Sequence, residues 1–598
     1  MPRTSQQEDE KEHLIRSHSQ YTLTDSSSIR SFASSSSTLA NCPVVSNDID
    51  DDEEKNFGLL SQDPSSEFSS IEKHQYTQSW RQTPLTLRGL TALFLRLPVA
   101  ILQPLLPSFI FHSPPRKLHP TSYLDGLRGV AALIVFMDHF VLNWYYVLRN
   151  GYLSSPEDVY FLQLPIIRLI FAGRASVGVF FVISGFVLSY KPLKQIRSGD
   201  KAAVLSTLSS SVFRRSMRLY IPIFFGTFIS MNLAYNQYFT PVPSRGELIP
   251  PILPTYSDQL HHWWHYTMEL IFPFWAGGID PNRAYGPPYN GHLWTIPIEF
   301  YGSMVVFLTV LATAGARSGG VRMCLISGIC CWSMKRGRWD VFSFLGGVVL
   351  AEWSLITCAE EKRGEEERLP SHHERYEDEE PASLSIDTQP TSRISRSLPS
   401  LFRPLYTLRK PLNLALLLLS LYLLSYAGES PSPGLYYLPL LPFTPSIWEP
   451  IFLGREHFWL SLGALLLIFC LINSPTLRKP FETAFAQYLG DISYSLYIIH
   501  GLVLFTIGTY MQDKWTGQIG EDRWVDNGMG ELVEAVVRIE IVEVGSWGYF
   551  KAWALTGVVC SAAVLWGADL FWRVVDQGAV RGGRWVEGFF TGRGRGRR

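Results

Sequence analysis

Long apolar stretches separated by shorter polar ones dominate the chain from residue 129 to residue 573. A helix that crosses a membrane needs about 20 consecutive apolar residues. Ten stretches approach that length, so the pattern predicts an all-α fold, a polytopic membrane helix bundle of about ten transmembrane helices. The ten stretches are 129–148, 171–190, 217–237, 294–314, 320–334, 340–358, 411–427, 455–473, 487–511 and 551–573.

Polar segments flank and interrupt this bundle. Residues 1–85 are rich in Ser, Asp and Glu, a composition that predicts a disordered N-terminal tail. Residues 86–120 are apolar but broken by arginines and prolines, which favours an interfacial or re-entrant segment, with a spanning helix as the alternative. We expect residues 121–575 to form the transmembrane domain, with 359–410 as a disordered cytoplasmic loop insert and 576–598 as a basic C-terminal tail.

Composition supports the membrane assignment and limits the choice of partners. Only 18% of the 598 residues are charged, against about 25% in soluble globular proteins. The net charge of −1 says little about partners, because the charges gather in the tails and in one loop. We expect the lipid bilayer as a partner and no nucleic acid. The seven cysteines lack paired CxxC spacing, so no zinc or thiol-redox site and no bound metal is predicted.

Lysine and arginine are biased toward one side of the predicted bundle, as expected for cytoplasmic loops. If the N-terminal tail is cytoplasmic, loop 191–216, loop 474–486 and the C-terminal tail all place their basic residues inside. Lys335, Arg336 and Arg338 then fall outside, so either their loop is an exception or the division of 320–358 into two spans is wrong. We expect a multi-pass protein of an endomembrane or plasma membrane, with both termini cytoplasmic.

Titratable side chains inside membrane spans are costly to bury and are functional candidates for that reason. In the first span, Arg128 and His139 lie eleven residues apart, which returns them to nearly one helix face about 16 Å apart along the axis. Asp125 lies one turn before Arg128 and can pair with it. Asp138 points about 100° away from His139. A positively charged membrane anchor and a core histidine are the structural alternatives for Arg128 and His139.

A second cluster lies where the third span begins. Arg214 and Arg215 are four and three residues before Arg218, so the three guanidinium groups can converge. Converging guanidiniums suit phosphate oxygens, whether of a ligand or of lipid headgroups.

Two further clusters lie in later spans. Glu299 enters an apolar span and needs a partner from another helix, with His139 or an arginine as the candidates; His292 and Trp294 precede it. Pro297 is tolerated if it lies in the first helical turn, in which case His292 precedes the helix. Near the end of the chain, three polar residues share one helix face and suit either chemistry or interhelical contact: Ser493, Tyr497 and His500.

In their order and spacing, these clusters resemble the acyltransferase-3 family of membrane O-acyltransferases. That family shows an arginine and a histidine eleven apart in its first span, then RxxR, FFxISGF, W-x-x-x-x-E and S-Y-x-L-Y-x-x-H. The matching positions are Arg128/His139, Arg215/Arg218, Phe180 to Phe186, Trp294/Glu299 and Ser493/His500. The resemblance runs from about Tyr123 to Trp572 and specifies no acceptor.

The resemblance implies transfer of an acyl group, often acetyl, from acyl-coenzyme A to a hydroxyl of a carbohydrate, lipid or natural product. Acyl-coenzyme A is then a co-substrate, and no bound cofactor is expected. A mid-membrane His139 would act as general base or as acyl carrier, with Glu299 orienting it. Donor phosphates would lie on Arg128, Arg214, Arg215 and Arg218. The supporting residues would be Asp125, His292, Trp294, Ser493, Tyr497 and His500.

A transporter is the alternative from another functional class. Intramembrane His, Glu and Arg also form proton relays. The chain shows neither an internal repeat nor a clear pair of interrupted half-helices. An Asp-His-His-Cys palmitoyltransferase is excluded, because Asp138-His139 has no cysteine-rich domain beside it.

Overall fold

The structure is a computed structural model that describes residues 106–108, 118–239, 250–272, 286–366, 403–427, 432–451, 453–516, 518–526, 532–540 and 545–591. All of these belong to the compact unit Glu54–Arg598. The predictions for residues 1–85, for most of 86–120 and for 367–402 of the loop insert lie outside the described residues.

Each of the ten predicted spans is a helix. They are α5 (Ser122–Trp144), α6 (Gly173–Arg197), α7 (Lys201–Tyr235), α10 (Thr295–Thr313), α11 (Gly319–Lys335), α12 (Trp339–Glu366), α13 (Arg403–Leu424), α14 (Gly454–Ile472), α16 (Ala484–Val503) and α18 (Gly545–Phe571). In the described part of the chain, seven helices are long and apolar enough to cross a membrane; α5, α11 and α13 are the three predicted spans outside that set. The prediction of a polytopic helical bundle is confirmed.

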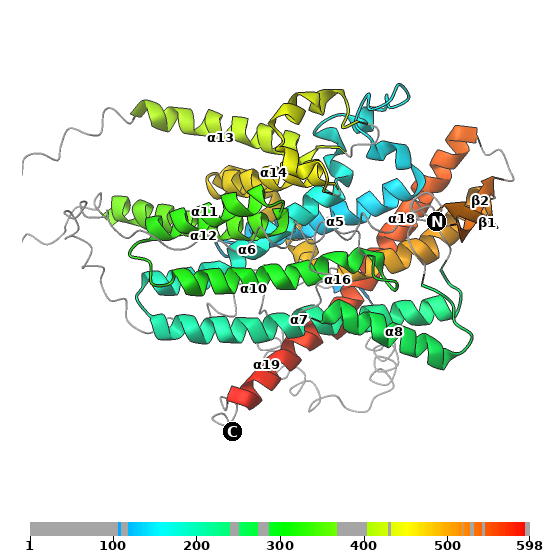
Figure 1. Cartoon of the computed structure of the whole chain (residues 1–598), viewed down its shortest axis with the longest axis horizontal. Coiled ribbons are helices and arrows are strands. Elements are labelled where there is room, and N and C mark those ends of the chain that lie inside the picture. The colour runs from blue at the N-terminus through cyan, green and yellow to red at the C-terminus, as the bar shows by residue number, and fades with distance from the viewer. Residues whose placement is uncertain are drawn as a thin grey trace, which may run out of the picture. The chain divides into compact units, whose positions relative to one another are not determined.

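Shorter elements lie between and after these helices. The helical ones are η3 (Tyr146–Arg149), η4 (Phe161–Gln163), η5 (Ile167–Phe171), α8 (Tyr256–Ile271), η7 (Gly291–Trp294), η8 (Leu435–Phe443), η9 (Ser446–Trp448), α15 (Pro475–Arg478), η10 (Lys479–Glu482), the π-helical η11 (Leu504–Gly508), α17 (Thr509–Thr516), the π-helical η12 (Trp572–Asp576) and α19 (Gln577–Thr591). An antiparallel hairpin that the apolar pattern did not predict pairs β1 (Gln518–Asp526) with β2 (Leu532–Glu540), with Gln518 opposite Glu540. It follows α17 and precedes α18 (Figure 1).

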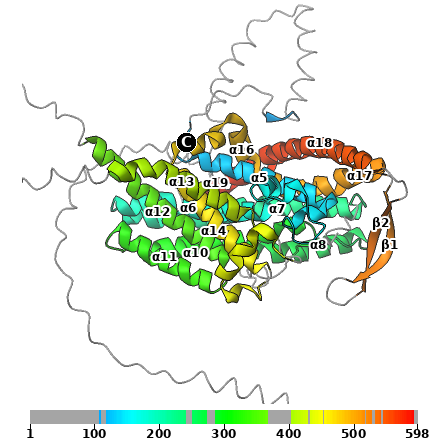
Figure 2. The same ribbon diagram turned by 90° about the horizontal axis from the view of Figure 1, so that it is seen from above.

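Many of the long helices run nearly parallel or antiparallel to one another (Figures 1 and 2). Helices α5 and α16 point the same way, because Gly129 packs on Gly490 near their starts and His139 packs on His500 near their ends. Helix α6 points the opposite way, since its first residue, Gly173, packs against Asp138 late in α5.

Glycines bring the central helix backbones into direct contact. A side-chain carbon added at Gly129 would lie 2.3 Å from the backbone nitrogen of Gly490, and one at Gly185 would lie 1.9 Å from the carbonyl oxygen of Phe344. Helices α5 and α16, and α6 and α12, could not approach so closely with larger residues there. The small residues at helical spacing in 176–186 predict close helix packing, and Gly185 provides it between α6 and α12.

Helix α5 begins at Ser122 and ends at Trp144, where the apolar pattern predicted 129–148. The pattern missed the first turns because they contain Ser122, Asp125 and Arg128. Ser122 and Asp125 are nevertheless buried, and hydropathy does not register a polar turn that is packed against another helix. His139 consequently lies nearer the end of its helix than the predicted span implied.

The structure divides 320–358 into the two helices α11 and α12, as predicted. The side of the membrane on which the basic loop between them lies stays a prediction. Arg338 donates from Nε and Nη2 to the two carboxylate oxygens of Asp340, at 2.9 and 2.7 Å. Asp340 is fully buried, and this pair gives one of the three basic residues a local partner.

Candidate active site

Three histidines from three segments meet in the bundle. The rings of His139 in α5 and His292 in η7 have centroids 3.8 Å apart, and His500 in α16 lies 5.2 Å from the first and 4.5 Å from the second. His292 and His500 are buried, and His139 is half-buried. The sequence placed these residues in three separate clusters, and the fold joins them into one, here called the histidine layer.

The orientation of His500 follows from its hydrogen bond. Its Nδ1 lies 3.1 Å from the carbonyl oxygen of Leu496, one turn earlier in α16. A carbonyl oxygen can only accept, so Nδ1 carries the proton in the neutral ring and Nε2 is the basic nitrogen. The site thus contains an imidazole held in one tautomer.

Close packing holds the histidine layer together. A side-chain carbon at Gly501 would lie 2.5 Å from the His292 ring, so only glycine leaves room for that ring against α16. The ring of Phe505, in the π-helical turn η11, stacks on His292 at 5.8 Å. The hydroxyl of Tyr497 donates to the carbonyl oxygen of His292 and bonds the Thr295 hydroxyl at 2.7 Å.

The three histidines could also hold a metal ion, since one nitrogen of each lies within 4.8 Å of the others. Three histidines with an open fourth position are a known catalytic zinc arrangement. Imidazoles that bind one ion point their nitrogens at it, whereas His292 and His500 are stacked with their ring planes 29° apart. The absence of a metal stays a prediction.

Arg128 connects the first and last clusters of the sequence. Its Nε donates to the Ser493 hydroxyl at 2.9 Å, and its Nη2 donates to the carbonyl oxygen of Gly490 at 2.8 Å. Asp125 lies 3.8 Å away, as the one-turn spacing predicted. A guanidinium has five N–H donors, so these bonds leave donors for a ligand.

Glu299 lies with the arginines. It pairs with Nη2 of Arg215 and accepts a hydrogen bond from the Ser184 hydroxyl at 2.6 Å. Arg215 also donates from Nε to Ser303 at 3.0 Å. Of the two partners considered for Glu299, an arginine is the one with which the structure pairs it, and Glu299 lies seven residues, or about 10 Å, along the helix from His292.

The remaining arginines join the same region. Arg218 is half-buried, with Asp576, Arg128 and Arg215 as electrostatic neighbours. Arg214 lies 3.7 Å from Glu587 of α19. We call Arg128, Arg214, Arg215 and Arg218 the arginine layer.

The two layers are separated by about 10–16 Å along three helices. Arg128 precedes His139 by eleven residues in α5, which is about 16 Å. Ser493 precedes His500 by seven residues in α16, which is about 10 Å. Glu299 follows His292 by about the same distance. A ligand with an anionic head and an extended arm could therefore reach from one layer to the other.

Sequence reasoning missed several contributors. Ser184 was interpreted only as a small packing residue, yet it bonds Glu299. Ser303 and Asp576 were not considered, because neither belongs to a recognisable cluster. Among the predicted supporting residues, Trp294 is half-buried and packs on the main hydrophobic core, outside the histidine stack.

Comparison with known proteins gives a consistent result. A family model described as an acyltransferase domain matches residues 121–572. The O-acetyltransferase PaAT-1 of Phomopsis amygdali is 29% identical over 503 residues, covering 80% of this chain and 87% of that protein. The acyltransferase clz18 of Cochliobolus lunatus is 25% identical over 440 residues, covering 67% of this chain and 86% of that protein. No solved structure matches.

Proposed function

Because the chain belongs to the acyltransferase-3 family of membrane O-acyltransferases, we propose that it transfers an acetyl group from acetyl-coenzyme A to a hydroxyl of a carbohydrate, lipid or natural product. The O-acetyltransferase among its relatives supports the choice of acetyl. The observation that carries the proposal is the separation of an arginine layer from a histidine layer along the same helices.

The arginine layer binds the phosphates of the donor. Charge-assisted hydrogen bonds from guanidinium to phosphate are shorter and stronger than neutral ones. Arg128, Arg215 and Arg218 supply them, and Arg214 lies beside them in α7. Glu299 is then a positioning residue that fixes Arg215, and the arm of the donor carries the thioester toward the histidines.

The histidine layer performs the transfer. His139 accepts the proton of the acceptor hydroxyl as the acceptor oxygen bonds to the acyl carbon. The carbon–sulfur bond then breaks, and the coenzyme A thiolate takes the proton from the protonated His139 as it leaves. His500, with Nε2 as its basic nitrogen, and His292 share the charge that develops on His139. In the second route, His139 itself takes the acyl group and passes it on.

The two routes differ in one measurement. Purified protein incubated with radiolabelled acetyl-coenzyme A and no acceptor should retain label at His139 only if an acyl-histidine forms. Protein-bound label that is present in the wild type and missing in His139→Gln supports the covalent route. If the wild type carries no protein-bound label, the general-base route is supported.

The acceptor can be found by comparing hosts with and without the protein. Metabolite profiling should show acetylated compounds that appear with the wild type and disappear with His139→Gln. Identical profiles in the two strains, with the protein inserted in the membrane and its substrate pool present, would contradict acetyl transfer.

The donor side is cytoplasmic in this proposal, since basic residues gather there and acyl-coenzyme A is a cytosolic metabolite. Both termini and loop 359–410 are then cytoplasmic, in an endomembrane or the plasma membrane. Epitope tags at positions 20, 380 and 595 should react only after permeabilisation. A tag at 380 that reacts on intact cells or sealed vesicles would reverse the orientation.

A further inference from the structure

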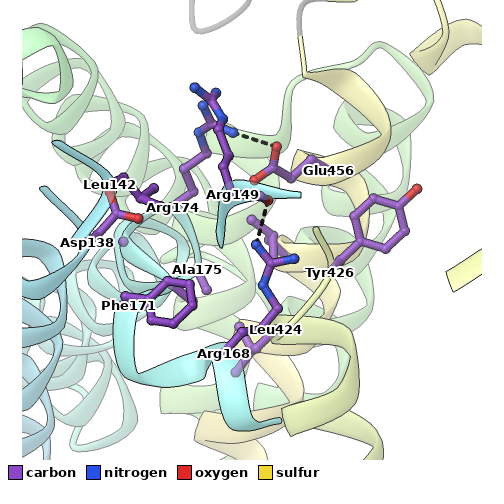
Figure 3. Close-up of a pocket in the computed structure, with 13 residues that line it drawn as sticks. Asp138, Leu142, Arg149, Arg168, Phe171, Arg174, Ala175, Leu424, Tyr426 and Glu456 are labelled. Carbon is purple, nitrogen blue, oxygen red and sulfur yellow. Dashed lines mark hydrogen bonds and ion pairs between the residues drawn. The ribbon is translucent and has the colours of Figure 1, made fainter. Parts of the chain in front are cut away.

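A small cavity lies away from the arginine layer, where α5 ends and α6 and α14 begin. Its volume is about 50 Å³. The charged residues that line it are Asp138, Arg149, Arg168, Arg174 and Glu456, as Figure 3 shows. The sequence analysis assigned no role to the three arginines, because they lie in or beside the loop between two spans.

Arg168 is the most deeply buried of the three arginines, with 7% of its surface exposed. Its Nη2 donates to the carbonyl oxygen of Arg149 at 2.8 Å, the contact drawn in Figure 3. Tyr437 is a hydrogen-bonding neighbour of the same guanidinium, and Glu456 and Asp138 are its electrostatic neighbours. A guanidinium has five N–H donors, so Arg149 and Tyr437 leave donors for an oxyanion in the cavity.

The charges around the cavity favour one negative charge. Arg174 pairs with Glu456 at 2.7 Å, which leaves two arginines against the single carboxylate of Asp138. The cavity is also lined by the first residues of α6 and α14, whose N-termini carry partial positive charge. A monoanion balances this set, whereas a dianion would leave it net negative.

The size of the cavity selects the kind of anion. A volume of about 50 Å³ holds about three to five water molecules at 10–15 Å³ each. That is room for a carboxylate group, with the rest of its molecule outside the cavity.

The cavity lies level with the histidine layer. Asp138 precedes His139 in α5 and points to another face of that helix. Gly173, which packs on Asp138, lies eleven residues or about 16 Å along α6 from Ser184, the partner of Glu299. The cavity thus lies about as far from the arginine layer as His139 does. It is therefore toward the end of the bundle opposite to the proposed donor phosphate site.

We propose that this cavity binds the carboxylate of the acyl acceptor and thereby positions the acceptor hydroxyl at His139. The inference rests on the proposed acyl transfer and adds a substrate class to it, a hydroxylated monocarboxylic acid. Donor and acceptor then enter from opposite ends of the bundle, each held by its own arginines.

Anion binding can be measured without any transfer. Sodium acetate should raise the melting temperature of the detergent-solubilised full chain in a saturable way, at constant ionic strength with chloride as the balance. Arg149→Met should weaken the apparent affinity for acetate tenfold or more, the effect of losing one charge-assisted hydrogen bond of about 1.5 kcal/mol. Arg168→Lys keeps the charge but loses the planar fork of the guanidinium, so it should also weaken the affinity for acetate.

The matched control is Arg455→Met, which removes an exposed arginine of α14 that pairs with Glu449 at 3.0 Å and does not line the cavity. Its response to acetate should equal that of the wild type. The proposal is overturned if acetate raises the melting temperature equally in the wild type, Arg149→Met and Arg168→Lys. It is also overturned if acetate does not raise the melting temperature of the wild type. Stronger stabilisation by inorganic phosphate than by acetate assigns the cavity to a different anion and also overturns it.

A transfer assay tests the acceptor role. With acetyl-coenzyme A as donor, the wild type should show a lower KM for 12-hydroxydodecanoate than for its methyl ester, and Arg149→Met should abolish the difference. A preference for the free acid that persists in Arg149→Met contradicts the proposal. Acetate binding at the cavity without transfer to either compound counts against the acceptor role and leaves the anion site standing, so the two failures are distinguishable.

Discussion

The arginine layer and the histidine layer occupy the same helices and are held in opposite ways. In the arginine layer, charged groups are balanced by charged groups: Arg215 pairs with Glu299, and Arg128 lies beside Asp125. In the histidine layer, three aromatic rings pack against one another and against Phe505. In the arginine layer, acidic side chains compensate the charges of the arginines. In the histidine layer, the rings are closely packed and the imidazoles can be neutral.

The difference separates two tasks that a transferase must combine. Fixed charges bind a charged donor equally in its ground state and transition state, which lowers KM. A neutral imidazole can accept a proton as the transition state forms, which raises kcat. The two layers should therefore respond to substitution in different kinetic constants.

The largest effect should come from His139→Gln. Glutamine keeps the size and a hydrogen bond but cannot accept a proton, so kcat should fall about 10²–10⁴-fold. Steady-state kinetics with acetyl-coenzyme A measure this, and His265→Gln, on exposed α8, is the control. A correctly inserted His139→Gln protein with near wild-type turnover would move the chemistry to His500.

Arg215→Ala should raise the KM for acetyl-coenzyme A with a smaller change in kcat. Loss of a charge-assisted hydrogen bond costs about 1.5–3 kcal/mol, or about 10–150-fold. Because alanine leaves Glu299 without its guanidinium, a melting curve must show that the variant folds, and Arg215→Lys provides a milder change. Arg317→Ala, at an exposed arginine between α10 and α11, should leave KM unchanged. An unchanged KM in a stable Arg215→Ala protein removes this residue from donor binding.

A matched pair of glycine substitutions tests the layers separately. Gly501→Ala places a carbon 2.5 Å from the His292 ring, so it should shift that ring and lower kcat. Gly129→Ala places one 2.3 Å from the α16 backbone beside Arg128, so it should destabilise the protein by about 1–3 kcal/mol and raise donor KM. Thermal melts and steady-state kinetics on both variants distinguish these effects. If Gly501→Ala instead raised donor KM and Gly129→Ala lowered kcat, the two layers would not be separate.

The smallest effect should come from Ser493→Ala, which removes the hydroxyl that accepts from Nε of Arg128. Net loss of one such bond is worth about 1 kcal/mol, which is about a fivefold rise in donor KM. Ser495→Ala is the control, since its buried hydroxyl has no hydrogen-bond partner among the described residues. Equal donor KM in both variants would mean that Ser493 does not support Arg128.

The apolar pattern predicted the helices well and their partners poorly. It located ten helices, seven of which lie in segments long and apolar enough to cross a membrane. Helical periodicity also correctly put Arg128 and His139 toward the same neighbour, α16. It could not bring His292 and His500 to His139, because the register between distant helices is set by contacts such as Gly129 on Gly490. Those contacts are invisible in a single sequence.

Two other misses have separate physical causes. The β1–β2 hairpin lies outside the predicted spans, and its strands of nine residues each are too short to register in a search for apolar stretches of about 20 residues. Arg168 lies in a loop that the span pattern treats as exposed, although the fold buries it. Burial of a loop charge depends on how the helix ends meet, and this follows only from the assembled bundle.

The separation of binding from chemistry is tested most directly by equilibrium binding of acetyl-coenzyme A to two purified variants beside the wild type. His139→Gln should bind the donor as tightly as the wild type while transferring almost nothing, and Arg215→Ala should bind it at least tenfold more weakly. Donor binding lost in His139→Gln and retained in a folded Arg215→Ala would contradict the account.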